Sequence, residues 1–244
     1  MSMELNLIHF YPDLMSLYGS YANLSVLSQM LEKMGNAVTI TYVEMGDEAD
    51  IEGADFLFMG AGTEKRQKFA LEDFVRHGDE VKKAAERGTP MLFCGTAIEL
   101  LGKTIFDEQG REYSGIGLGS FTAKQQARRI VEDVYGTTSL YNDAVVGFMN
   151  KSSLLTGVET PFLTATALGF GNETKGGAEG FLCKNVIGSH LTGPILAKNP
   201  RLLERVIAAI YENRGENCPA IPKDTWAEQG YAVTARELKN RCGK

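Results

Sequence analysis

A cysteine at the end of an apolar strand is the feature of this sequence that best fits covalent chemistry. Residues 90–95, PMLFCG, predict a short strand that ends at Cys94, and Gly95 permits a sharp turn into a helix expected from Thr96. Backbone amides and the dipole at the start of a helix favour thiolate over thiol. Because a thiolate attacks carbonyl carbon, this segment indicates acyl transfer.

The same cysteine also fits a purely structural role. Free cysteine is commonly a small buried hydrophobe. A full nucleophile elbow has glycine two residues on either side of the nucleophile, where this chain has Leu92 and Thr96. The remaining cysteines are scattered without a C-x-x-C pair, so neither a zinc site nor a disulfide framework is indicated; they are Cys183, Cys218 and Cys242.

A thiolate needs a base, and the chain contains three histidines. His77 precedes Gly78 among charged residues, and we expect it on the surface. His9 lies inside an expected strand, where a core role and a functional role are equally compatible with the sequence. His190 follows a strand and begins a loop, which makes it the candidate base by elimination.

The oxyanion of an acyl-transfer intermediate needs preset backbone donors. Gly60-Ala61-Gly62 follows the apolar run DFLFM and can present one amide, and Gly95 can present a second. A plain strand-to-helix turn and a phosphate-binding turn remain alternatives, because a short Gly-x-Gly is weak evidence for any of them.

Strand and helix patterns alternate through the first hundred residues and must position these groups. The expected strands cover residues 5–11, 37–43, 55–59 and 91–94, and the expected helices cover residues 24–34, about 65–87 and 96–101. This β-α-β-α order predicts an α/β fold, with a mostly parallel sheet and helices on both faces. Sites in such sheets form at the carboxyl ends of strands.

The pattern changes after Gly102. Strand-like pieces at residues 129–135, 144–148, 163–168 and 181–187 predict an added, partly antiparallel section of the same sheet. Pro200 opens a further helix. We therefore expect one domain over residues 1–215 and a tail of unknown role over residues 216–244.

Composition excludes several classes of protein. The formal charge is -6 and there is no basic stripe, so a nucleic-acid partner is not expected. No apolar run approaches the roughly 18 residues of a membrane span, and the first residues lack the pattern of a signal peptide. The chain is expected to be cytoplasmic and free of membrane insertion.

Several short motifs, in order and spacing, give the chain a resemblance to a known family. They are Tyr11-Pro12-Asp13-Leu14-Met15, residues 55–67, residues 90–102, Gly169-Phe170-Gly171-Asn172, and Gly193-Pro194 with Lys198-Asn199-Pro200. With these motifs the chain resembles class I glutamine amidotransferases of the cobyric-acid-synthase-like type. Within them it looks most like the glutaminase subunits that serve lipid II amidation.

The resemblance implies a flavodoxin-like fold that hydrolyses L-glutamine to glutamate and ammonia. Ammonia would pass to a Mur-ligase-like synthetase subunit (MurT) that amidates D-glutamate of lipid II in a heterodimer. No cofactor is expected in this subunit, and ATP and magnesium are expected on the partner. By position, Cys94 would be the nucleophile, Gly62 and Gly95 the oxyanion hole, and Arg129 a ligand of the substrate carboxylate. His190 stays the candidate base, although it lies two residues before the position of the family's histidine. Arg129 also fits a surface charge at a strand edge.

The chain departs from the family pattern in three places. The usual C-G-G-Y-Q-x-L-G is replaced by residues 94–102, CGTAIELLG. This segment is one residue longer than the family motif when the two are aligned at Cys94. The usual histidine before Gly-Pro is Thr192, and F-E-N-H becomes residues 148–151, FMNK. No third catalytic member is evident, and Glu179 is a guess. A catalytically inactive binding or scaffold subunit, a cobyrinate-type acceptor and another cysteine hydrolase on this fold all remain alternatives.

Overall fold

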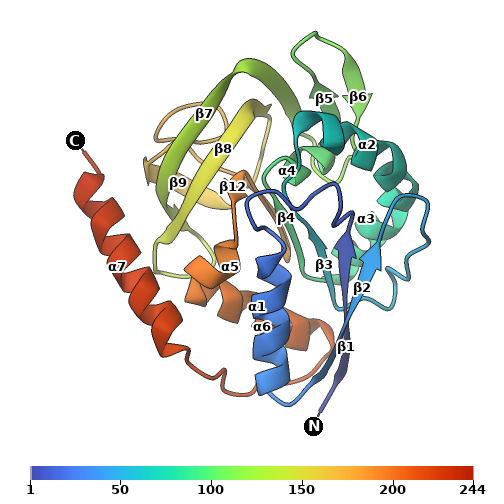
Figure 1. Ribbon diagram of the computed structural model, residues 1–244, viewed down its shortest axis with the longest axis vertical. Coiled ribbons are helices and arrows are strands. Elements are labelled where there is room, and N and C mark those ends of the chain that lie inside the picture. The colour runs from blue at the N-terminus through green and yellow to red at the C-terminus, as the bar shows by residue number, and fades with distance from the viewer. Residues whose placement is uncertain (1, 244) are drawn as a thin grey trace.

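The computed structural model describes residues 2–243 as a mixed α/β structure (Figure 1). The first half contains β1 Glu4–Phe10, α1 Ala22–Lys33, β2 Ala37–Val43, β3 Phe56–Met59, α2 Glu64–Phe74, the 3-10 turn η1 Val75–His77, α3 Gly78–Arg87, β4 Met91–Cys94, α4 Ala97–Leu100, β5 Thr104–Phe106 and β6 Glu112–Ser114. The second half contains β7 Thr122–Thr138, β8 Val145–Thr156, β9 Leu163–Leu168, β10 Phe181–Cys183, β11 Val186–Ser189, β12 Leu191–Thr192, α5 Ile195–Lys198, α6 Pro200–Asn213 and α7 Thr225–Arg241.

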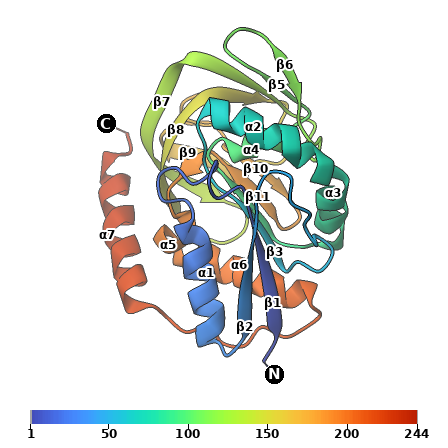
Figure 2. The same cartoon turned by 45° about the vertical axis from the view of Figure 1, so that its right-hand side comes forward.

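The first sheet has the strand order β10-β11-β4-β3-β1-β2. All of its neighbouring strands are parallel except β10 and β11, which form an antiparallel pair. Figure 2 shows helices on both sides of this sheet, with α1 and α6 on one side and α2 and α3 on the other. The predicted α/β fold with a mostly parallel sheet is confirmed.

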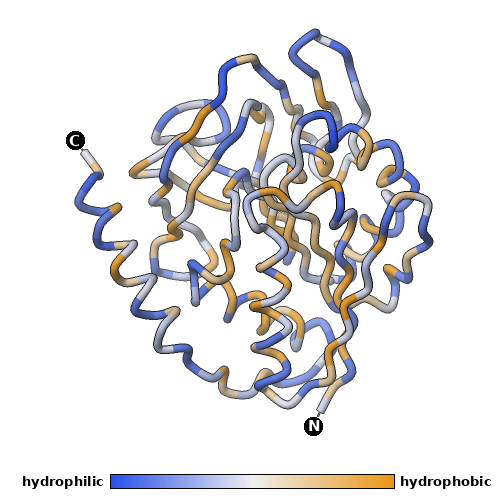
Figure 3. Tube along the Cα trace, viewed as in Figure 1, coloured by the Kyte–Doolittle hydropathy of each residue, from blue (hydrophilic) through white to orange (hydrophobic). Residues whose placement is uncertain are grey.

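Alternating side chains of β3 and β4 in the first sheet pack into two separate apolar cores. Phe56, Phe58, Leu92 and Cys94 pack with residues of α1 and α6, whereas Leu57, Met59, Met91 and Phe93 pack with residues of α2 and α3. Because both faces are covered, these strands are continuous apolar runs, visible as orange segments in Figure 3. The two-residue period of a strand therefore decides which core each side chain enters.

A second sheet holds most of the strands after Gly102. Its order is β12-β8-β7-β5-β6, with β9 paired to β7, and its pairs are antiparallel except β5 with β7. The expectation that this section continues the first sheet is wrong for these strands and holds for β10 and β11. The residues expected as one strand over 181–187 form a hairpin, because Lys184 turns the chain in the left-handed region at φ 51°.

The helix expected over about residues 65–87 is divided in two. Thr63 caps α2 by accepting a hydrogen bond from Arg66 N, and η1 then tilts the chain before α3 begins. The surface position expected for His77 is wrong: the residue is 3% exposed and its ring lies 5.8 Å from that of Phe10. Charged neighbours in the sequence point away from the core while His77 packs against it.

The tail forms α7, which lies beside β7, β8 and β9 at the edge of the molecule (Figure 1). Asp224 caps its start by accepting hydrogen bonds from Trp226 N and Ala227 N. Tyr231 Oη donates to Ala144 O, and Leu238 is buried. Within residues 2–243, no helix combines the length and apolar character that a membrane crossing requires.

Candidate active site

The turn between β4 and α4 has the geometry of a strand-to-helix elbow. Cys94 is the last residue of β4, and α4 begins at Ala97 after a two-residue turn. Gly95 adopts φ +60°, which a residue with a side chain rarely adopts, so glycine makes this turn at low cost. The helix expected over residues 96–101 is a single turn, and its dipole is correspondingly short.

The Cys94 side chain is sealed in the core that β4 shares with α1 and α6. It is 0% exposed, and burial raises the pKa of its thiol, with a further upward contribution from the Glu179 carboxylate. Its polar contact is with Asn23, whose Nδ2 lies 3.8 Å from Sγ. This surrounding favours the neutral thiol, the opposite of what a nucleophile needs.

His190 lies beside a carboxylate rather than beside the thiol. Its Nε2 is 3.0 Å from Ser153 Oγ, its backbone N–H donates to Glu179 Oε1 at 2.7 Å, and its Nδ1 is 3.5 Å from the same oxygen. Burial and the nearby Lys151 lower the pKa of His190, although Glu179 opposes them. Among residues 2–243, neither ring nitrogen of His190 hydrogen-bonds Cys94 Sγ. The guessed third member, Glu179, is thus adjacent to His190.

Both backbone amides expected in an oxyanion hole are bound within the protein. Gly62 N–H donates to Thr96 Oγ1 at 3.0 Å, and the same hydroxyl donates back to Gly62 O. Gly95 N–H donates to Ser189 O at 2.8 Å, as part of the contact between β4 and β11. Neither amide is free to receive a developing oxyanion in this conformation.

Arg129 lies at a bulge of β7 and is held by an ion pair. Its Nη1 donates to Glu64 Oε1 at 2.7 Å and its Nε donates to Asn150 Oδ1 at 2.7 Å. Burial raises the pKa of Glu64, but hydrogen bonds from Ser152 and Arg129 outweigh it and the pKa is lowered. The Arg129 side chain is 42% exposed, near the start of α2. A substrate carboxylate there would have to compete with Glu64.

A buried polar cluster next to the elbow was not expected from the sequence. Glu99 in α4 is 1% exposed and accepts hydrogen bonds from Gln67, Gln125 and Ser153, at 2.9, 2.8 and 2.6 Å. Lys151, 1% exposed, donates to a backbone carbonyl, and burial lowers its pKa to about 8. Glu99 and Lys151 both lie in motifs that depart from the family pattern. This departure is the sequence signal that could have indicated the cluster.

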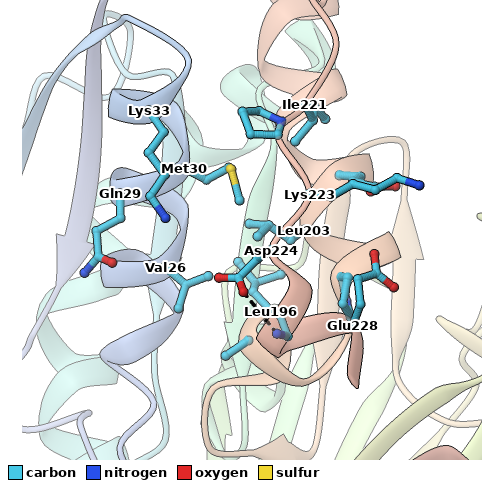
Figure 4. A pocket seen from close by; sticks show the side chains of 15 residues that line it. Val26, Gln29, Met30, Lys33, Leu196, Leu203, Ile221, Lys223, Asp224 and Glu228 are labelled. Atoms are coloured by element: carbon cyan, nitrogen blue, oxygen red, sulfur yellow. Dashed lines mark hydrogen bonds between the residues drawn. The ribbon is translucent and has the colours of Figure 1, made fainter. Parts of the chain in front are cut away.

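A separate pocket lies between α1, α5, the start of α6 and the segment that leads to α7 (Figure 4). Met30 and Leu203 supply apolar walls, and Lys33 and Lys223 stand at its edge. Cys94 and His190 are not among its lining residues. The pocket therefore does not extend the elbow.

The comparison with protein families identifies most of the chain. The model of the CobB/CobQ-like glutamine amidotransferase domain matches residues 6–200, from β1 to the start of α6. The matched segment contains both the elbow and the buried cluster.

Two curated relatives and one solved structure extend this comparison. The chain is 28% identical to the glutamine-hydrolysing lipid II isoglutaminyl synthase subunit GatD of Streptococcus pneumoniae, over 98% of this chain and 93% of that protein. It is 27% identical to the subunit of the same name from Staphylococcus aureus, over 91% of this chain and 89% of that protein. A glutamine amidotransferase crystal structure matches 83% of this chain and 98% of its own, with a TM-score of 0.50 and 18% identity, and this shows the fold alone.

Proposed function

This chain belongs to the CobB/CobQ-like glutamine amidotransferase family, and from that membership we propose that it is the amidotransferase subunit of a two-subunit carbon–nitrogen ligase that amidates D-glutamate of lipid II. The observation that carries the proposal is the family match over residues 6–200, joined to relatives that align along almost the whole chain. We place the complex in the cytoplasm and in peptidoglycan synthesis.

The partner in this proposal is a Mur-ligase-like synthetase subunit (MurT). It would bind ATP and magnesium, activate the α-carboxyl of D-glutamate and receive ammonia, while the present subunit needs no cofactor. A cobyrinate-type acceptor is the alternative substrate of such a ligase. Amidation of lipid II, with no turnover of a cobyrinate-type acid, distinguishes the two.

The first candidate for the chemistry is glutamine hydrolysis at Cys94. The thiolate would attack the side-chain carboxamide of L-glutamine, forming an S–C bond, and the C–N bond would break as ammonia leaves with a proton from His190. Water would then hydrolyse the thioester to glutamate. Gly62 and Gly95 would stabilise the oxyanion and Arg129 would bind the α-carboxylate. This route requires a rearranged elbow, because the thiol is sealed and both amides are bound.

The second candidate is a subunit that keeps the amidotransferase fold and does not hydrolyse glutamine. Three observations favour it: burial raises the Cys94 pKa, the His190 ring contacts Ser153 and Glu179, and the expected oxyanion amides are occupied. Such a subunit would shape or stabilise the synthetase, which would use ammonia from another source.

Glutaminase assays on the co-purified complex separate the two candidates. Under the first, wild type releases glutamate from glutamine, Cys94→Ala releases none, and Cys183→Ala, a half-buried cysteine outside the elbow, retains the activity. Under the second, the complex releases no glutamate and still amidates the acceptor when ammonium is supplied. Failure of the chain to associate with any Mur-ligase-like synthetase refutes both.

A further inference from the structure

The residue that makes the sharp turn of the elbow is Gly95, one position after the cysteine. Its φ of +60° is the sole left-handed conformation between Met91 and Leu101, whereas Cys94 continues the regular β4 strand. In a nucleophile elbow the reactive residue occupies the strained turn, so that its side chain projects at the top of the sheet. A strand residue instead points into one of the two cores, as Cys94 does.

The family motif supports the same register when it is counted from its last glycine. C-G-G-Y-Q-x-L-G placed with its end at Gly102 aligns its cysteine with Gly95 and its glutamine with Glu99, without an extra residue. The additional residue counted from Cys94 then disappears. The backbone agrees, because β4 pairs with β11 in unbroken register from Met91 to Cys94, and the turn into α4 follows directly.

A side chain at position 95 would point at two residues that close the space above the elbow. A Cβ placed on Gly95 meets Ala61 Cβ at 2.6 Å and Thr192 Cγ2 at 3.5 Å. Ala61 lies in the turn after β3, and Thr192 directly precedes Gly193-Pro194, where the family has its histidine. Position 95 therefore faces position 192, the pairing that a nucleophile and its base require.

Neither of these positions carries a reactive group in this chain. Gly95 has no side chain, and the Thr192 hydroxyl donates to Phe148 O at 3.1 Å. The Ala61 methyl fills the space that a thiol would need. We infer that position 95 is the nucleophile position of this fold and position 192 its acid–base position, so that the wild-type chain holds a vacated and sealed amidotransferase site. The inference rests on the proposed function and selects its second candidate.

Restoring the three residues together tests the inference. The triple variant Ala61→Gly, Gly95→Cys, Thr192→His opens the space and supplies a thiol opposite an imidazole. A chloroketone analogue of glutamine is the probe: the thiolate displaces chloride, an S–C bond forms as the C–Cl bond breaks, and the thiol proton passes to the imidazole. The double variant Ala61→Gly, Thr192→His is the matched control without the thiol.

We expect peptide mass mapping to find the label at position 95 of the triple variant, at a rate at least about 100-fold above any labelling of the control, and suppressed by glutamine. We expect no glutamine-protected label at Cys94 of wild type. Glutamine-protected labelling of wild-type Cys94, or a folded triple variant without label at position 95, overturns the inference. If the triple variant does not melt cooperatively, the wild-type result alone decides. Association with the synthetase is scored separately, so its loss counts against the proposed function alone.

Discussion

Replacing Gly95 with alanine measures how tightly the elbow is closed. The substitution places a side chain in the left-handed region, which costs about 1–2 kcal/mol. The new Cβ also meets the Ala61 methyl at 2.6 Å, well inside ordinary contact. Overpacking of a rigid core by one methyl group costs about 1–3 kcal/mol. We therefore expect Gly95→Ala to lower the free energy of unfolding by about 2–5 kcal/mol, a large part of a total of about 5–15 kcal/mol.

Gly215→Ala is the matched control for the backbone contribution. Gly215 has φ +70°, and a Cβ built on it has nothing within 4 Å, so the control carries the conformational cost without the collision. Urea unfolding followed by circular dichroism should place the Gly95 variant about 1–3 kcal/mol below the Gly215 variant.

A double-mutant cycle with Ala61→Gly isolates the contact between the two methyl groups. Removing the Ala61 methyl should return about 1–3 kcal/mol to the Gly95→Ala protein beyond the effect of Ala61→Gly alone. Equal destabilisation by the Gly95 and Gly215 variants, or a cycle with no coupling, would mean that the space opposite position 95 is open. Such a result would refute a sealed elbow.

Three further predictions concern stability. Burial lowers the pKa of His9 from 6.5 to about 4. The stability that the neutral ring contributes is therefore present above pH 6.5 and is lost as pH falls to 4, about 3 kcal/mol in all. The variant His9→Phe, whose ring would pack on Phe58, should flatten this part of the plot of urea midpoint against pH, and an unchanged plot would contradict the prediction. Arg214→Ala should lower the free energy of unfolding by about 1–3 kcal/mol, because the buried Asp55 carboxylate loses its cationic partner. Solvent screens the partly exposed arginine and keeps the loss within this range. An unchanged urea midpoint would contradict the prediction. Removing residues 216–244 should leave a cooperative unfolding transition weakened by about 2–4 kcal/mol, because the tail buries Leu238 and donates a hydrogen bond from Tyr231, while its partly exposed ion pairs to Arg201 and Asp133 add little. A truncated chain that does not fold would refute the boundary at residue 215.

Local sequence signals predicted strands β1 to β4 of the first sheet. The apolar runs at residues 37–43 and 91–94 coincide with β2 and β4, and the helix expected to stop before Gly35 ends at Lys33. These segments are recognisable because a strand buried on both faces and a capped amphipathic helix each leave a pattern within a few neighbouring residues. The hairpin of β10 and β11 was missed because a left-handed lysine leaves no such pattern.

The position of the site depended on contacts that the sequence does not display. Cys94 and Gly95 are adjacent, and either could be assigned to the turn when the strand phase is unknown. Only the fold sends Cys94 into the core beside Leu92, and only the fold brings Ala61 and Thr192 over Gly95. His190 and Thr192 were both near the expected base position, but β12 pairs with β8 and the His190 ring contacts Ser153 and Glu179 instead of the thiol.

The sequence by itself determined the α/β fold, the elbow and the family, because each is encoded by short-range hydrophobic periodicity, glycine placement and ordered motifs. Tertiary structure decided which residue of the elbow faces the site, and it decided that a buried cluster around Glu99 occupies the neighbouring space. Reactivity depends on the atoms that surround a thiol and on their access to water, and those neighbours come from strands that are far apart along the chain.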